Sequence, residues 1–130
     1  MSISGRRWRC LGGRMVYDDD LELTRYVWDH YAPLMTEFEL RAGQAILGRL
    51  KATHAEAPPS HPLWTRWGAA GDPAIEAALA DGPEAYRRRV RIRVLAESGG
   101  EVFVNRCPSC GRVVRTPNAR QCLWCGHDWH

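Results

Sequence analysis

Cys107-Pro-Ser-Cys110-Gly111 and Cys122-Leu-Trp-Cys125-Gly126 are the two stretches that decide the fold of the C-terminal part of this chain. In each, two residues separate a pair of cysteines, and glycine follows the second cysteine. A tight turn over such a stretch lets both sulfur atoms face one ion, and glycine permits the positive φ angle that the turn requires. Four thiolates form a closed tetrahedral site for an ion such as Zn²⁺. The pattern therefore predicts one metal ion bound by four ligands, Cys107, Cys110, Cys122 and Cys125.

Three other interpretations of the cysteines are possible, and the sequence favours them less. A disulfide or a thioredoxin-like redox motif needs one CxxC at a strand–helix junction, whereas this chain has two such pairs close together. A Cys₂His₂ site with His127 and His130 would leave two cysteines unused, and its histidines are closer in sequence than zinc fingers place them. We expect these histidines and Trp129 to cap the cysteine-rich segment, with a functional site of their own as the alternative. Iron bound by the same thiolates remains the alternative to zinc.

Residues 105–130 resemble the zinc-ribbon class with rubredoxin-like knuckles, on the strength of the two CPxCG-type turns. This resemblance covers about the last fifth of the chain and implies a small β ribbon around one Zn²⁺ ion. The whole chain is also similar to a group of small, uncharacterised bacterial zinc-ribbon proteins. They share the stretch Thr24–Tyr31, here TRYVWDHY, and the ending Cys125–His130, here CGHDWH. The second resemblance implies a fold and no activity.

Helix signals dominate the chain before the cysteines. Acidic residues 18–20 precede apolar residues that recur at helical spacing over 23–34, where a proline must end or kink the helix. Thr36 and Glu39 match a capping box, which predicts a second helix that stops before Pro58. The sequence therefore predicts two successive helices in this half of the chain, followed by a loop rich in proline, histidine and glycine.

The segment before the cysteines is harder to interpret. Asp72 followed by Pro73 predicts a short helix. Residues 87–95 alternate like a strand but also carry apolar residues at helical spacing, and a capping box formed by Asp81 and Glu84 favours a helix. Residues 101–105 predict a strand that enters the metal site.

The resulting fold class is a mainly α-helical body with a small C-terminal β zinc ribbon, an α+β architecture. We predict a disordered leader over 1–15, a helical domain over 16–98 and the zinc ribbon over 99–130. Met15 is an alternative start of the protein, and Cys10 in the leader is expected to be a free thiol without a role.

Charge is distributed unevenly along the chain. Residues 1–14 carry a net charge of +4, residues 15–81 carry −6, and residues 82–130 carry +5. A polyanion would therefore approach the C-terminal third. Seventeen of the eighteen basic residues are arginine, a bias that a GC-rich genome also produces, so it is weak evidence for nucleic-acid binding.

The candidate partners are a nucleic acid and a protein. Four arginines surround the cysteines and form the candidate nucleic-acid surface, with Trp124 as a base-stacking platform: Arg106, Arg112, Arg115 and Arg120. A solvated basic face is the structural alternative. The six tryptophans favour a protein partner, because a chain of this size cannot bury all of them.

Catalysis is not expected from this sequence. It lacks a phosphate-binding glycine loop, an HExxH motif and a GxSxG motif, and a four-thiolate zinc ion leaves no position open for water. His30, His54 and His61 could cluster, but no spacing rule requires it.

Neither a long apolar segment nor a secretory signal is present, so we expect a cytoplasmic protein that does not enter a membrane. The predicted function is a non-enzymatic, zinc-binding interaction module, with an iron-binding, rubredoxin-like electron-transfer protein as the alternative.

Overall fold

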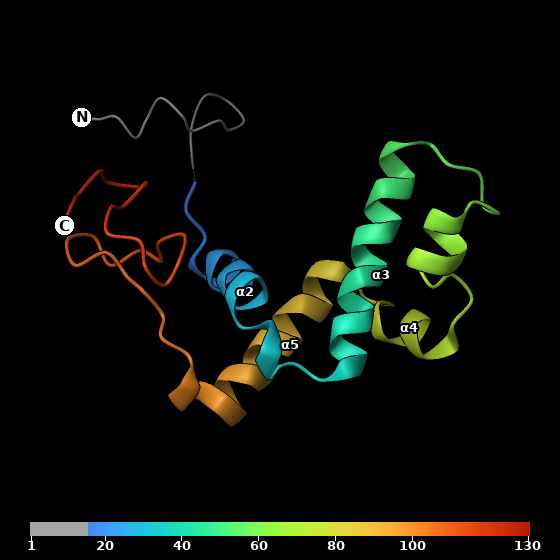
Figure 1. Ribbon diagram of the computed structural model, residues 1–130, viewed down its shortest axis with the longest axis horizontal. Helices are drawn as coiled ribbons and strands as arrows, with labels where there is room; N and C mark the ends of the chain where they lie inside the picture. The colour runs from blue at the N-terminus through green and yellow to red at the C-terminus, as the bar shows by residue number, and fades with distance from the viewer. Residues whose placement is uncertain (1–15) are drawn as a thin grey trace. The chain divides into compact units, whose positions relative to one another are not determined.

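The computed structural model describes residues 16–130, so the predictions for the leader 1–15 and for Cys10 lie outside the described residues. The described part is mainly helical, as Figure 1 shows. Its α-helices are α2 (Asp19–His30), α3 (Glu37–His54), α4 (Pro73–Ala78) and α5 (Pro83–Ser98). Shorter turns are η2 (Ala32–Leu34) and η4 (Gly99–Glu101), which are 3₁₀, and η3 (Leu63–Trp67), which is π-helical. Between residues 16 and 130, every helix is too short or too polar to cross a membrane.

The chain divides into two compact units, which are described separately below. Of the described residues, one unit contains 16–31 and 95–130, and we call it the knuckle unit. The other contains 32–94, and we call it the helical unit. The sequence predicted a boundary between residues 98 and 99, whereas contacts group α2 with the cysteine-rich segment.

The capping box predicted for the second helix is confirmed in α3. The Thr36 hydroxyl accepts a hydrogen bond from the Glu39 backbone N–H at 3.1 Å, and the Glu39 carboxylate accepts one from the Thr36 N–H at 2.9 Å. The same carboxylate accepts two hydrogen bonds from the Arg93 guanidinium, at 2.6 and 2.7 Å. Glu39 therefore fixes the start of α3 and connects it to α5 inside the helical unit.

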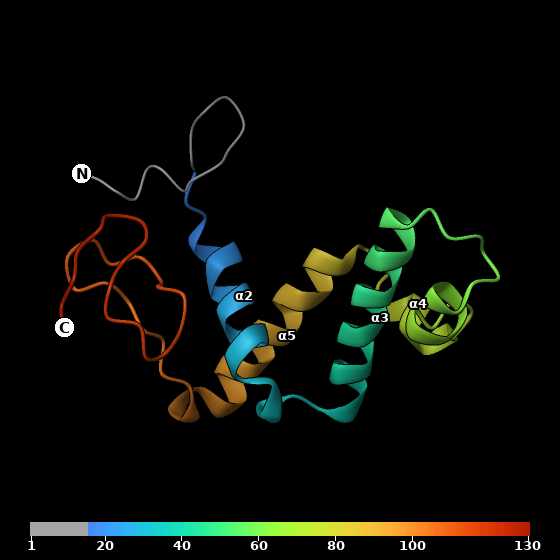
Figure 2. The ribbon, with the colours of Figure 1, turned by 45° about the horizontal axis from the view of Figure 1, so that its top comes forward.

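The predicted loop after α3 contains the π-helical turn η3, which lies beside α3 in both Figure 1 and Figure 2. Gly48 permits this approach, because a Cβ atom there would lie 2.7 Å from the Trp67 carbonyl carbon. The Arg49 side chain donates from Nε to the Gly68 carbonyl at 2.7 Å, which ties the end of the turn to α3.

The remaining helix predictions are confirmed, with one difference. Asp72 caps α4 through its side chain, and Pro73 occupies the first turn. Residues 83–98 form α5, so the helical interpretation of 87–95 is right and the strand alternative is wrong. The difference concerns Asp81, which the sequence places in a capping box at the start of α5. Its carboxylate instead forms an ion pair with Arg89.

The strand predicted over 101–105 is wrong, and the β ribbon is not seen as a sheet. Over residues 16–130, antiparallel pairing is confined to two isolated bridges, Arg106 with Val113 and Gln121 with Asp128. The Phe103 N–H and carbonyl and the Asn105 N–H hydrogen-bond to the hydroxyls of Tyr26 and Tyr31, whereas the Asn105 carbonyl pairs with backbone, the Val114 N–H. The tyrosine hydroxyls thus pair with backbone N–H and C=O groups that, in a β-sheet, would pair with a neighbouring strand.

Candidate metal centre

Two equivalent turns carry the four cysteines. In the first, the Gly111 N–H donates to the Cys107 carbonyl at 2.8 Å; in the second, the Gly126 N–H donates to the Cys122 carbonyl at 2.9 Å. The φ angles of the two glycines are +78° and +83°. The prediction that glycine is needed for a left-handed backbone after each second cysteine is therefore confirmed.

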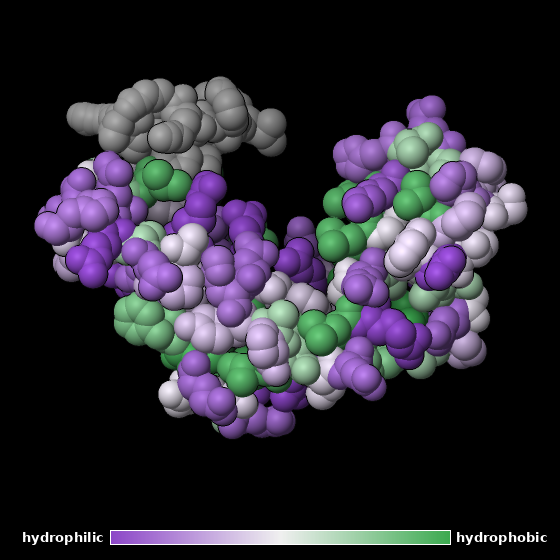
Figure 3. Space-filling view, viewed as in Figure 1, coloured by the Kyte–Doolittle hydropathy of each residue, from purple (hydrophilic) through white to green (hydrophobic). Residues whose placement is uncertain are grey.

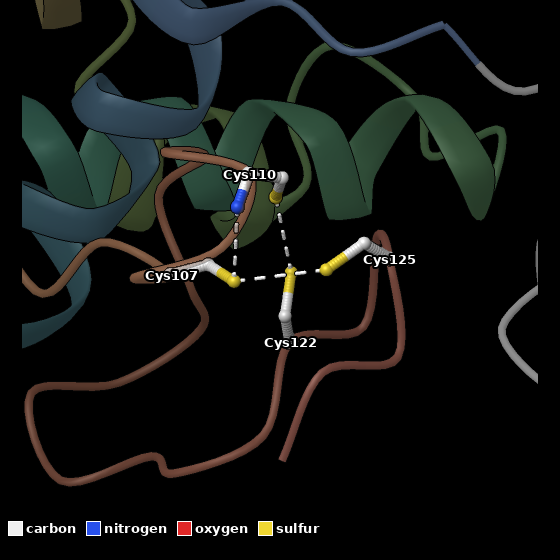
Figure 4. Close-up of side chains that lie close together, drawn as sticks. All are labelled: Cys107, Cys110, Cys122 and Cys125. Atoms are coloured by element: carbon white, nitrogen blue, oxygen red, sulfur yellow. Dashed lines mark hydrogen bonds between the residues drawn. The ribbon is translucent and has the colours of Figure 1, made fainter. Parts of the chain in front are cut away.

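The two turns bring all four sulfur atoms together, as the close-up in Figure 4 shows. Cys107 Sγ lies 3.6 Å from Cys125 Sγ, and Cys110 Sγ lies 3.7 Å from Cys122 Sγ. All four ligand atoms lie within 4.8 Å of one another. Tetrahedral thiolates with metal–sulfur bonds of about 2.3 Å would be about 3.8 Å apart. The cysteines are thus positioned to bind one metal ion.

Backbone N–H groups in both turns point at the sulfur atoms. Cys107 Sγ accepts hydrogen bonds from Ser109 N at 3.3 Å and from Cys110 N at 3.4 Å. At the equivalent place in the second turn, Cys122 Sγ accepts from Trp124 N at 3.3 Å. Such donors stabilise the negative charge of a thiolate, which is the form that binds a metal ion.

The pKa values of the thiols indicate what a cation would change. Burial would raise the pKa of Cys107, but backbone N–H groups of Cys110 and Ser109 hold that pKa at about 7. Burial raises the pKa of Cys122 to about 12, and burial also raises the pKa of Cys125. Neutral pH alone therefore does not ionise the whole cluster, so a bound cation must displace protons from it.

The sulfur atoms lie in a small apolar core. Cys107 and Cys122 are buried, whereas Cys110 and Cys125 are exposed. Val114 is buried with Cys107 and Cys122, and these three residues form the core. Three partly buried residues pack against it: Ala119, Trp124 and Trp129. Trp129, which the sequence places among the capping residues, thus packs against this core.

Asn105 organises the segment between the two turns, and sequence analysis missed it. This buried side chain donates from Nδ2 to the carbonyls of Thr116 at 2.9 Å, Pro117 at 3.3 Å and Ala119 at 2.9 Å. An amide placed two residues before a metal-binding cysteine is the only local signal, and it names none of these partners.

Tyr26 and Tyr31 hold the backbone that enters the first turn, and their role was also missed. The Tyr26 hydroxyl donates to the Phe103 carbonyl at 2.6 Å and accepts from Asn105 N at 3.2 Å. The Tyr31 hydroxyl lies 3.2 Å from the Phe103 carbonyl and accepts from Phe103 N at 3.1 Å. Since a buried phenol needs a hydrogen-bond partner, an apolar stripe with two tyrosines was the available signal.

The histidines do not join the cysteine cluster, which in residues 16–130 is the only group of three or more potential ligands. His130 Nδ1 lies 2.5 Å from the Asp128 carboxylate, and the His127 ring stacks on Trp129 with centroids 5.8 Å apart. His30 Nε2 lies 3.0 Å from the Arg115 carbonyl, so α2 contacts the segment between the two turns.

Two of the four candidate nucleic-acid-binding arginines have partners within the knuckle unit. Arg106 forms an ion pair with Asp19 at 2.8 Å and also donates to the Gly111 carbonyl. The Arg112 guanidinium lies 5.3 Å from the Tyr17 ring centroid and 6.0 Å from that of Trp124. Cations over aromatic faces are attracted to the ring electrons, so Arg112 covers part of the proposed stacking platform.

The other two candidate arginines, Arg115 and Arg120, are exposed. Arg115 also lines a hollow of about 270 Å³ between α2 and the turns, together with Arg25, Asp29 and Trp124. The structure therefore places Arg115 at this hollow and Arg112 near the ring of Trp124, which also lines the hollow.

Comparisons with known protein families, with curated proteins and with solved structures found no match for this chain. The similarity to small bacterial zinc-ribbon proteins therefore stays a prediction.

Proposed function

We propose that the four cysteines bind one Zn²⁺ ion, and that the knuckle unit is a metal-stabilised interaction module. The observation that carries this proposal is the approach of the sulfur atoms, with pairs at 3.6 and 3.7 Å. These separations match four thiolates around one tetrahedral ion. Such a site has no position left for a substrate or a reactive water, which supports a structural role for the ion and a non-enzymatic protein.

Iron in the same thiolates is the alternative ion, because a tetrahedral site of four sulfur ligands also suits iron. Purified protein separates the two. A zinc protein is colourless and contains one zinc ion per chain by elemental analysis, whereas an iron protein absorbs visible light and changes colour on reduction. If the purified protein contains redox-active iron, the function that follows is electron transfer and not that of an interaction module.

The proposed interaction surface is the basic side of the knuckle unit, around the exposed Arg115 and Arg120. Its partner would be a nucleic acid or a protein with an acidic surface in a bacterial cytoplasm. The +5 net charge of residues 82–130 supports a polyanionic partner, since opposite charge steers association. Arg106 and Arg112 contribute less, because Asp19 and two aromatic rings already contact them.

Binding of fluorescent single-stranded DNA and RNA at several salt concentrations tests the surface. We expect affinity to fall steeply with salt, and the double variant Arg115→Glu, Arg120→Glu to bind at least about tenfold more weakly. The control is Arg88→Glu, which reverses the charge of an exposed arginine on α5 in the helical unit. If neither nucleic acid binds at low salt, a nucleic-acid partner is ruled out and a protein partner is left.

A further inference from the structure

A second feature of the molecule, independent of the cysteines, is the rigid attachment of η3 to α3 in the helical unit. Gly48 leaves room for the Trp67 backbone, and Arg49 bonds the residue that follows it. At the other end, the Trp64 indole N–H donates to the Ala57 carbonyl at 3.0 Å. Single π-helical turns are rare and often occur at functional sites. This one is held in place while its last residue, Trp67, is exposed.

Exposed apolar side chains lie on both sides of the contact between α3 and η3. Trp67 is 52% exposed and Leu47 is 56% exposed. A hollow of about 280 Å³ separates them, and we call it the α3–η3 groove; its lining residues are Gln44, Leu47, Gly48, Lys51, Leu63 and Trp67. Figure 3 shows hydrophobic residues, in green, over α3 on the visible face. Large apolar side chains gathered in this way mark binding surfaces.

The rim of the groove is positively charged. Lys51 lines it, and a neighbouring hollow on the other side of Trp67 adds Arg41 and Arg66. Asp72 is the one acidic residue that lines either hollow, and it pairs with Arg41 at 2.9 Å. The Arg66 guanidinium lies 5.2 Å from the Trp67 ring centroid, so a cation flanks the apolar anchor directly.

We propose that the α3–η3 groove docks an acidic amphipathic helix of a partner protein. A stripe of leucines on such a helix would fill the space between Leu47 and Trp67, while carboxylates beside the stripe would meet Lys51 and Arg66. Residues 1–14 of this chain carry four arginines and no acid, so their charge has the same sign as the rim and disfavours them as the occupant.

Two synthetic helical peptides test the proposal on the full-length, metal-loaded protein. One carries leucines along one face and glutamates beside them; the other has lysine in place of every glutamate. Tryptophan fluorescence and calorimetry measure binding. We expect the glutamate peptide to bind at least about tenfold more tightly than the lysine peptide. The double variant Lys51→Glu, Arg66→Glu should reverse this preference.

Leu47→Asp locates the binding site, with Leu50→Asp as the matched control. Leu50 is 52% exposed on the same helix but does not line the groove. We expect the first variant to weaken binding of the glutamate peptide and the second to leave it unchanged. The proposal is overturned if this peptide does not bind, if the lysine peptide binds equally well, or if Leu47→Asp has no effect. Self-association that Leu47→Asp abolishes would also overturn it, because a second copy would then occupy the groove.

Discussion

Asn105 is a buried polar residue whose side chain bonds the entry to the first turn to the segment between the two turns. Its amide N–H groups reach three carbonyls in the segment that joins the two turns. The side chain is buried, so no solvent molecule replaces these bonds without rearrangement. One amide thereby fixes the distance between the first and the second pair of sulfur ligands.

Asn105→Ala is expected to destabilise the knuckle unit by about 2–3 kcal/mol, because three partly buried carbonyls lose their donor. Metal affinity should fall with it, since the second pair of cysteines is no longer positioned. Competition with a zinc chelator measures the affinity. Asn118→Ala is the control, because residue 118 is exposed in the same segment. Equal chelator resistance of both variants would contradict the role of Asn105.

Tyr26→Phe removes only a hydroxyl, which donates to Phe103 O and accepts from Asn105 N. We expect a loss of about 1–3 kcal/mol, because two backbone groups are left without this partner. Tyr31→Phe is the matched control: it also removes bonds to Phe103, but water reaches this more exposed site, so the loss should be smaller. Urea unfolding measures both, and a larger effect at Tyr31 would count against this interpretation.

At the residue scale, the features that could be predicted from sequence are those that depend only on neighbouring residues. Each cysteine pair and its glycine form one turn, so spacing alone identified them. Asn105 and Tyr26 could not be found in the same way, because Tyr26 bonds to a residue 77 positions away. The partner of His30 is likewise 85 positions away.

Among the elements, α3 is fixed at its start by one carboxylate with two tasks. Glu39 caps the helix and accepts both hydrogen bonds from Arg93 of α5. Burial would raise the pKa of Glu39, but the hydrogen bonds from Arg93 and Thr36 outweigh it and hold the pKa below its ordinary value of 4.5. The charged form is therefore the one that stabilises the helical unit.

The stability contributed by Glu39 is present above its ordinary pKa of 4.5 and is lost as pH falls from there through the lower pKa of the folded state. Glu39→Gln should therefore cost about 1–3 kcal/mol at pH 7, and the difference from the unmodified protein should shrink toward pH 3. Thermal unfolding at several pH values measures it. Glu37→Gln, an exposed change in the same helical turn, is the control. A difference that does not depend on pH would contradict the assignment.

Helix starts were predictable because capping residues and prolines act within one turn, as Thr36 and Pro73 show. The strand predicted over 101–105 failed because extended residues only form a strand if another backbone pairs with them. Here tyrosine hydroxyls take both backbone bonds of Phe103. The π-helical turn was not predicted either, since it depends on the space that Gly48 leaves beside Trp67.

On the scale of the whole molecule, we expect the two units to depend on a bound metal ion to different extents. The knuckle unit has only a small core, which surrounds two sulfur atoms. In zinc-finger peptides, a structural zinc ion contributes about 10–16 kcal/mol to the free energy of folding. The helical unit contains its own capping box and the Glu39–Arg93 ion pair. The division into 16–31 with 95–130, and 32–94, could not be derived from sequence, because it rests on contacts between distant residues.

Removal of the metal with a chelator should therefore unfold the knuckle unit selectively. We expect amide NMR signals of residues 105–130 to lose dispersion, while those of α3 stay close to their original positions. Re-addition of zinc should restore them. Lower pH should make removal easier, because ligand thiolates with raised pKa values take up protons. A uniform loss of signals from both units would show that they do not differ in metal dependence.

The most direct test of the four-sulfur site combines native mass spectrometry with X-ray absorption at the metal edge of the purified protein. The account predicts one zinc ion per chain with four sulfur neighbours at about 2.3 Å, and loss of the ion in Cys122→Ser. A metal-free mass, disulfides between these cysteines, or nitrogen in the place of any sulfur neighbour would contradict it.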